Sequence, residues 1–285
     1  MPYDNVCLGL CFFDQQLFYA VSAPEQRSYL RRIGAIDFNF NIGEALFSVA
    51  EEKIAGIRSS IDDLINRFGI QQLQILVYPH LECWATLPKL VYDNADERES
   101  YINILMNGVE RKHIRPAWYE LSNQNFKLLQ LRTDHGMKGL EKLTGGLAEV
   151  GFSSAFEMDE RWIQHAKPGG SILTICGFSN CIAICSFILG KLRGVTYITF
   201  DDAEDLPYLW LQKSQDLPWM QGLHEHIHVC GRRAQKIIEI LQPFLDDAGV
   251  ITKMDSLEKI QVRADERTYG FDLSLAFPAI MLALR

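Results

Sequence analysis

Residues 170–200 read GSILTICGFSNCIAICSFILGKLRGVTYITF and carry the most regular apolar pattern in the chain. Apolar residues, many of them β-branched or aromatic, fill three runs, at 172–176, 181–188 and 192–200. Turn-forming residues separate these runs at 177–180 and 189–191. The pattern predicts a meander of three β-strands joined by two tight turns. Because hydrophobic residues predominate throughout, we expect this meander to lie in the middle of a sheet.

The whole sequence has the composition of an ordinary globular protein, since 48% of its 285 residues are hydrophobic and 22% are charged. A chain of this length can hold two domains. The formal net charge of −8 argues against nucleic acid as the main partner, because phosphate binding needs concentrated Lys and Arg. No run reaches the roughly 20 apolar residues of a membrane span.

Two features of the sequence bear on its cellular location. Residues 1–5, MPYDN, lack the basic start of a secretory signal. The seven cysteines, an odd number, lie mostly inside apolar, strand-like runs. Buried free thiols in a reducing compartment explain this pattern best. We therefore expect a cytoplasmic protein.

The first part of the chain predicts the element order β-β-β-α-β. Its strands are expected at 6–13, 17–22, 28–38 and 73–78. Between the third and fourth strands, Asn41 and Glu44 resemble a helix capping box with Asn in place of Ser or Thr. Apolar residues at helical spacing continue to Phe68, and Gly69 is a suitable C-cap. We expect one helix over this stretch.

The remaining chain predicts further helices and strands around a linker, Lys-Pro-Gly-Gly, at 167–170. Before the linker we expect helices at 96–106, 135–150 and 158–165 and a strand at 126–131. After the meander we expect an acidic turn at 201–205, strands at 226–230 and near 260–262, and helices at 232–245 and 271–285. The two halves therefore share one order of elements.

This duplicated order resembles the actin-like superfamily, which includes actin, Hsp70 and sugar kinases, and within it the PilM-type pilus-assembly proteins and their type II secretion relatives. The segments that carry the resemblance are 6–21, 148–152, 172–200, 227–231 and 277–285. The resemblance implies an α/β protein of two actin-like (ribonuclease H-like) halves, each a β-meander followed by alternating helices and strands. It implies a first half at 1–167, with an inserted subdomain around 79–134, and a second half at 168–285.

The sequence departs from the family where the family binds metal and phosphate. The family's phosphate loops carry an Asp two residues before a Gly, but here Ile175 stands two residues before Gly177. In the first meander Gly9 or Leu10 stands where the Asp is expected, and Asp14 lies in the turn beyond. Phosphoryl transfer depends on such acidic ligands and their magnesium. We therefore expect no catalytic residues and no metal site.

Three residues still match the nucleotide-contacting pattern of the family, namely Gly177, Ser179 and Gly231. The resemblance implies that these would contact a nucleotide if one binds. Arg232 follows Gly231 where the family has a second glycine, and its side chain would crowd the nucleotide. We therefore expect no cofactor, with ATP and magnesium as the alternative.

Other clusters in the sequence each have a functional and a structural interpretation. The alternating residues His224, His226, His228 and Cys230 could ligate zinc from one face of a strand, or could simply lead into a buried strand. The acidic residues Asp201, Asp202, Glu204 and Asp205 fit a solvated turn better than a site for a cation or a basic partner. The cysteines Cys176, Cys181 and Cys185 lack zinc or redox spacing and are expected in the core. The aromatic residues Tyr208, Trp210 and Trp219 suit internal packing or a partner surface.

As the resemblance implies, we expect a non-catalytic scaffold or assembly protein acting through protein contacts in a pilus- or secretion-type envelope machine. Its partner would be a protein, such as a membrane assembly protein that contributes a short peptide, and the chain would be peripheral to the inner membrane through that partner. The alternatives are a phosphotransferase of the sugar- or acetate-kinase type and a homodimeric structural protein.

Overall fold

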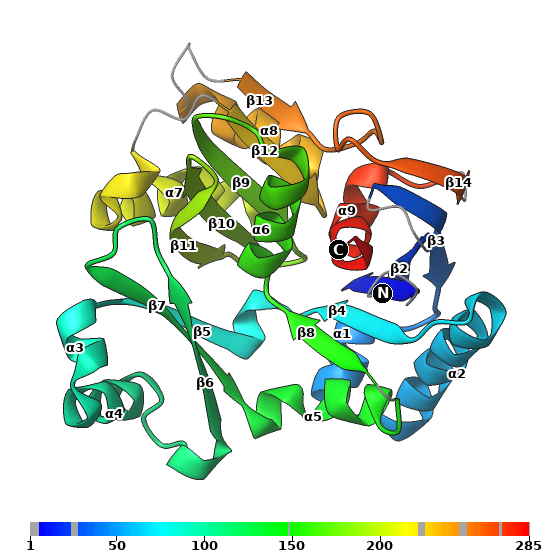
Figure 1. The fold of residues 1–285 in the computed structure, drawn as a ribbon, viewed down its shortest axis with the longest axis horizontal. Coiled ribbons are helices and arrows are strands. Elements are labelled where there is room, and N and C mark those ends of the chain that lie inside the picture. The colour runs from blue at the N-terminus through cyan, green and yellow to red at the C-terminus, as the bar shows by residue number, and fades with distance from the viewer. Residues whose placement is uncertain are drawn as a thin grey trace, which may run out of the picture.

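The computed structural model describes residues 6–23, 28–147, 149–221, 226–244, 250–267 and 270–284. Within these residues the strands form three sheets. Figure 1 shows helix α9 (Leu273–Ala283) between the sheet that contains β1 to β3 and the sheet that contains β9 to β13. The structure is thus α/β and two-lobed, as expected.

The first sheet has the strand order β14-β3-β2-β1-β4-β8. Its strands are β1 (Cys7–Phe13), β2 (Gln16–Ser22), β3 (Tyr29–Asp37), β4 (Gln72–Leu76), β8 (Val150–Ser153) and β14 (Arg263–Arg267). Strands β1 to β3 form the predicted antiparallel meander, and β4 runs parallel to β1. The helices of this lobe are α1 (Ile42–Phe47), α2 (Glu51–Phe68) and α5 (Asp134–Thr144).

The second sheet has the order β11-β10-β9-β12-β13. Its strands are β9 (Ser171–Gly177), β10 (Cys181–Ile188), β11 (Lys191–Thr199), β12 (His226–Gly231) and β13 (Val250–Lys253). Leu173 and Ile175 point into a core with α7 (Leu206–Asp216) and α8 (Ala234–Leu241), whereas Ile172 and Cys176 join the core around α6 (Ala155–Ala166) and α9. Because both faces of β9 and β10 are buried, these two strands are largely apolar. They lie inside the sheet as predicted, but the prediction is wrong for β11, which lies at the edge of the sheet.

A third, small sheet with the order β5-β7-β6 follows β4 in the chain. Its strands are β5 (Glu82–Pro88), β6 (Ile114–Glu120) and β7 (Phe126–Thr133), and its helices are α3 (Lys89–Asp93) and α4 (Ala95–Leu105). Leu87, Ile102 and Leu129 belong to a separate hydrophobic core between this sheet and its helices. We call residues 82–133 the inserted subdomain. The expected helix at 96–106 and strand at 126–131 both lie in it and are confirmed.

Helix α9 packs directly on the backbone of β1. A Cβ atom on Gly9 would lie 2.0 Å from the carbonyl oxygen of Ala279, so only glycine allows this approach. The residues of α9 are almost all buried, because the helix also contacts β12 and α6. The division of the chain at 167/168 stays a prediction, and β14, which follows that point, pairs with β3 of the first sheet.

The helix predicted from the Asn41 cap to Phe68 is wrong in one respect, because Val49 interrupts it with a φ of 54°. Asn41 does cap α1, since its Oδ1 accepts the Glu44 N–H at 3.0 Å. A Cβ on Gly139 of α5 would lie only 2.0 Å from the Leu46 carbonyl oxygen. This close packing on α5 fixes the direction of α1. Helix α2 runs in a different direction, so the chain must break between the two helices at Val49.

Three other boundaries were predicted wrongly. The helix expected at 135–150 ends at Thr144 before Gly145 and Gly146, and residues 150–153 form β8 against β4. The strand expected near 260–262 is absent there, because Gln261 has a φ of 57°, and β14 begins just beyond it. Within the described part of the helix expected at 232–245, only α8 is a regular α-helix, and residue 245 lies outside the described residues. Strand β6 was not predicted. It is an edge strand, and Pro116 together with its charged residues interrupts the apolar alternation by which a strand is recognised.

Candidate functional site

Two hairpin turns from different sheets meet between the lobes. Asp14 occupies the β1–β2 turn with a φ of 51°, and Ser179 occupies the β9–β10 turn. The Ser179 hydroxyl donates to Asp14 Oδ1 at 2.5 Å. The backbone of the Asp14 turn is itself anchored, because its carbonyl oxygen accepts the Ile42 N–H at 2.6 Å. The contact therefore joins two ordered turns.

Arg232, which follows β12, adds a charge to this contact. Its Nη1 forms an ion pair with Asp14 Oδ2, and its backbone N–H donates to the Gly177 carbonyl oxygen at 2.8 Å. Its side chain is 35% exposed, and burial and the neighbouring Arg233 lower the pKa of Arg232. Among the described groups, Arg232 Nε has no hydrogen-bond partner. We call Asp14, Ser179 and Arg232 the interlobe contact.

Aromatic rings from both lobes fill the space behind the interlobe contact. The Phe178 ring lies 5.9 Å from that of Phe13 and 5.6 Å from that of Tyr78, centroid to centroid. Phe178 is only 2% exposed. The Tyr78 hydroxyl donates to the Phe12 carbonyl oxygen at 2.5 Å, and burial raises the pKa of Tyr78. Tilted rings at these separations are typical of aromatic packing in a protein core, so the space behind the interlobe contact is filled by side chains.

The two glycines that match the nucleotide pattern lie opposite each other in strands β9 and β12. A Cβ on Gly177 would lie 2.1 Å from the Arg232 carbonyl oxygen, and one on Gly231 would lie 2.3 Å from the Gly177 carbonyl oxygen. Gly231 also has a φ of 80°. The structure thus brings Gly177, Ser179 and Gly231 together, and close backbone packing explains both glycines.

The residues at this position do not fit a magnesium nucleotide. Ile175 is fully buried in the core beneath α7 and α8, and its side chain offers no ligand atom. Leu10 is likewise buried, and Gly9 faces α9. Asp14, whose carboxylate lies in the β1–β2 turn, already binds Ser179 and Arg232. A metal at this carboxylate would compete with both of these partners.

Among the described residues, the alternating His226, His228 and Cys230 do not form a cluster that could hold a metal ion. His224 lies outside the described residues. The rings of His226 and His228 are 6.1 Å apart, and His228 packs edge-on against Trp162 at 4.6 Å. Burial lowers the pKa of His228 to about 4, so the ring is neutral at pH 7. Cys230 is buried, and burial raises the pKa of its thiol.

The other sequence clusters have local structural roles. In the acidic turn, Asp202 Oδ1 accepts the Glu204 N–H at 3.1 Å, and Glu204 pairs with Lys236 at 2.7 Å. Trp210 is buried in the core of the second lobe, whereas Tyr208 is 70% exposed. Cys176, Cys181 and Cys185 are buried free thiols, as expected.

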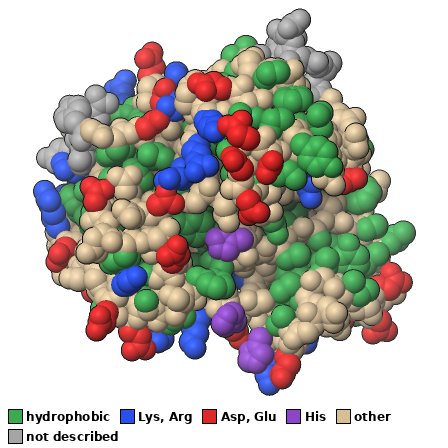
Figure 2. Space-filling view, turned by 180° about the vertical axis from the view of Figure 1, so that it is seen from behind, with side chains coloured by type: hydrophobic (Ala, Val, Ile, Leu, Met, Phe, Trp, Pro, Cys, Tyr) green, Lys and Arg blue, Asp and Glu red, His purple; other side chains and the backbone are tan. Residues whose placement is uncertain are grey.

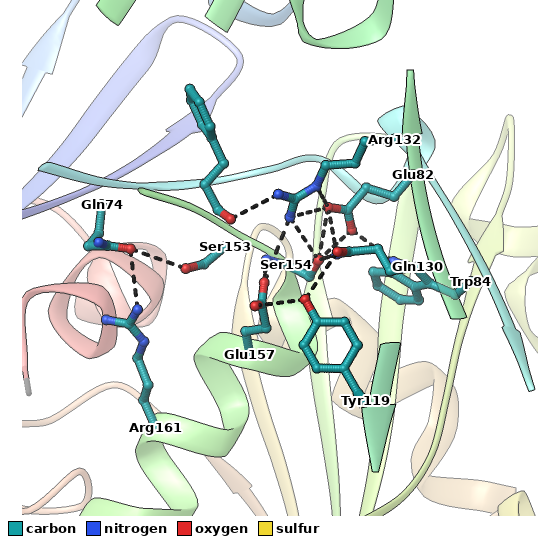
Figure 3. Close-up of polar contacts among 11 residues, drawn as sticks. Gln74, Glu82, Trp84, Tyr119, Gln130, Arg132, Ser153, Ser154, Glu157 and Arg161 are labelled. Atoms are coloured by element: carbon teal, nitrogen blue, oxygen red, sulfur yellow. Dashed lines mark hydrogen bonds and ion pairs between the residues drawn. The ribbon is translucent and has the colours of Figure 1, made fainter. Parts of the chain in front are cut away.

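A second polar cluster, not predicted, joins the inserted subdomain to α6 (Figure 3). Glu82 of β5 and Arg132 of β7 form an ion pair at 2.6 Å, and the Glu82 side chain is fully buried. Arg132 Nη1 donates to the Phe152 carbonyl oxygen of β8 at 3.0 Å. The Ser154 hydroxyl donates to Glu82 Oε2 at 2.6 Å. Burial raises the pKa of Glu82, although Arg132 and Ser154 oppose this shift.

The same cluster continues along α6. Glu157 Oε2 accepts the Ser154 N–H at 2.7 Å, and Glu157 Oε1 accepts the Tyr119 hydroxyl at 3.0 Å. Further along the helix, Arg161 donates to Gln74 Oε1 at 3.2 Å and to the Leu282 carbonyl oxygen at 3.1 Å (Figure 3). Helix α6 therefore holds the inserted subdomain, β4 and α9 in one arrangement. Glu82 and Arg132 lie outside every strand that the sequence predicted, so no local pattern indicated this cluster.

No family model matches the sequence, and no curated protein matches it. Solved structures do match. The structure described as the PilM-PilN type IV pilus biogenesis complex aligns over 97% of this chain and 97% of that chain, with a TM-score of 0.66 and 10% identity. This chain has an actin-like fold. The resemblance to PilM predicted from the order of elements is confirmed at the level of the fold.

Two further solved structures have related descriptions. A Bacteroides thetaiotaomicron protein with an actin-like ATPase fold and unknown function aligns over 88% of this chain and 91% of that chain, with a TM-score of 0.51 and 11% identity. The cytoplasmic domain of EpsL, an inner-membrane component of the Vibrio cholerae type II secretion system, aligns over 99% of this chain and 96% of that chain, with a TM-score of 0.47 and 10% identity. Within the described residues, no helix is long and apolar enough to span a membrane.

Proposed function

We propose that this actin-like protein is a non-catalytic assembly factor that acts through protein contacts in a pilus- or secretion-type envelope machine. The observation that carries the proposal is the interlobe contact. The phosphate-loop turns of an actin-like enzyme must receive a nucleotide between them, but here Asp14 binds Ser179 and Arg232 across that position. Phe178 and Phe13 fill the space behind.

The apolar side chain at position 175 supports the same proposal. The Ile175 side chain supplies no oxygen atom, and phosphoryl transfer requires a cation to neutralise charge on the phosphates. A phosphotransferase of the same superfamily is therefore the weaker candidate. The fold similarity to PilM, whose structure is a complex with PilN, supports a protein partner of comparable type.

We place the partner site at the junction between the first lobe and the inserted subdomain. Phe47 at the end of α1 is 63% exposed. The centroid of its ring lies 6.5 Å from that of His135 of α5, edge to face. His80, also exposed, packs against Tyr78 where the chain enters the inserted subdomain. Figure 2 shows a hollow on this side of the molecule, bordered by histidine and hydrophobic side chains. A short peptide with apolar side chains suits such a surface.

Photo-crosslinking in the cells that produce the protein tests this proposal. A benzophenone amino acid replaces Phe47 in one variant and Tyr208, the exposed aromatic residue of α7, in a control variant. The proposal predicts an adduct with one membrane-fraction protein from position 47 and none from position 208. A synthetic peptide from the crosslinked segment should then bind the purified chain, and Phe47→Asp should weaken binding at least about tenfold. Equal adducts at both positions, or no adduct at position 47, would contradict the proposal.

A further inference from the structure

The hairpin between β10 and β11 ends in a turn whose sequence does not suit its conformation. Ile188 pairs with Lys191 around the two turn residues Leu189 and Gly190, whose φ angles are 49° and 77°. A two-residue turn with two positive φ angles favours Asn-Gly. Leucine is disfavoured in this left-handed region, and the Leu189 side chain is also 78% exposed. Residues that break a local rule without a compensating contact are expected at functional sites.

The apolar tip is flanked by positive charges. The Ile188 side chain, next to Leu189, is 38% exposed. The Leu189 N–H donates to the Gly170 carbonyl oxygen at 2.9 Å, which places the tip against the linker. Lys167 of the linker and Lys191 of β11 are exposed, and Arg193 is half-buried. None of these three cations forms an ion pair with a carboxylate in the described part of the chain. The chain as a whole has a net charge of −8, so three such cations beside one apolar tip make this region locally positive on a negatively charged protein.

We propose that this tip, Ile188 to Lys191 with Lys167 and Arg193, docks on the surface of an anionic phospholipid bilayer. Leu189 and Ile188 would enter the boundary between headgroups and acyl chains, while the cations would contact lipid phosphates. The cations come from two separate segments, the linker and β11, and so fit an extended anionic surface better than one acidic side chain. This inference goes beyond the proposed function, because it requires no protein partner.

Co-sedimentation of the purified full chain with vesicles tests the inference. One set of vesicles contains phosphatidylcholine alone, and the other contains a third phosphatidylglycerol. We expect binding only to the anionic set, weakened by salt because the attraction is electrostatic. Lys191→Gln should lower the partition coefficient about fivefold, the effect of one cation near an anionic surface.

Leu189→Asn is the sharpest variant, because Asn suits the turn while removing the apolar side chain. It should lower vesicle binding about tenfold and leave the melting temperature unchanged or higher, so lost binding cannot be attributed to unfolding. Ile104→Asn, at a 73% exposed apolar residue of α4, is the matched control and should bind as the unaltered chain does. Absence of binding to the anionic vesicles, or equal binding by Leu189→Asn, would overturn the inference. A tip that instead contacts a protein would give either of these results.

Discussion

Asp14 is the residue on which the interlobe contact depends, because one of its oxygens accepts the Ser179 hydroxyl and the other pairs with Arg232. Asp14→Asn removes the charge while keeping the shape. We expect it to lower the free energy of unfolding by about 1 kcal/mol, the range for charge-assisted contacts that are partly exposed. Urea denaturation measures this change.

The control for Asp14 is Asp201→Asn in the exposed acidic turn, which should leave stability unchanged. A double-mutant cycle of Asp14→Asn with Arg232→Met should show a coupling energy of similar size, since the two residues contact each other. Additive effects would mean that Asp14 stabilises the protein by some other route.

Asp159 of α6 gives the protein a predictable pH dependence. Its carboxyl is 1% exposed, accepts the Thr174 hydroxyl at 2.6 Å, and has an Oδ1 with no described partner. Burial raises the pKa of Asp159 from 3.8 to about 7. The unfolded chain therefore releases this proton near pH 4 and the folded chain near pH 7, so stability falls as pH rises between those values.

Asp159→Asn should remove this dependence. Relative to the unaltered protein, the variant should gain stability between pH 5 and pH 8, because only the unaltered chain must bury a charge at the higher pH. Urea denaturation at both pH values gives the comparison. If the free energy of unfolding changes equally with pH in the variant and in the unaltered protein, Asp159 does not cause the pH dependence.

At residue scale, the position of Ile175 relative to Gly177 can be read from the sequence, and the structure shows that Ile175 is buried in the core of the second lobe. The sequence could not predict the interlobe contact. Asp14 and Ser179 are 165 positions apart, and nothing local to either residue indicates the other. Arg232 was expected to crowd a nucleotide, and only the structure shows that it pairs with Asp14 instead.

At the scale of elements, the close approach of β9 and β12 explains the glycines at their ends. Gly177→Ala should destabilise the protein by about 3 kcal/mol or more, because the new methyl group would meet the Arg232 carbonyl oxygen at 2.1 Å. Gly56→Ala is the matched control, since nothing lies within 4 Å of a Cβ there. It should stabilise α2 by about 0.5 to 1 kcal/mol. Thermal unfolding of both variants tests this, and a mild effect at Gly177 would reopen a role in ligand binding.

Elements with a strong apolar period were predicted well, and those defined by tertiary contacts were not. The three strands of the 172–200 meander are confirmed, because burial on both faces makes β9 and β10 largely apolar and β11 still buries Leu192, Val195 and Ile198. The break at Val49 arises from the packing of α1 on α5, which no local pattern reveals. Strand β6 lies at an edge, where burial is incomplete and the alternation is weak.

At the scale of the whole molecule, α9 and α6 make the two lobes one unit. Helix α9 packs against strands of both sheets, and Arg161 of α6 bonds to β4 and to α9. Nucleotide-driven opening of an actin-like protein would have to separate the interlobe contact and the ring packing of Phe13 with Phe178. These contacts hold the two lobes in one arrangement, as the proposed assembly role requires.

The central claim is that the interlobe contact takes the place of a nucleotide. A thermal-shift titration of the purified chain with magnesium and ATP tests it most directly, with magnesium alone and ATP alone as controls. A ligand at 100 times its dissociation constant stabilises the folded state by about 2.7 kcal/mol, which moves the melting temperature measurably. We predict no shift at millimolar nucleotide. A shift that requires both magnesium and ATP would contradict the account.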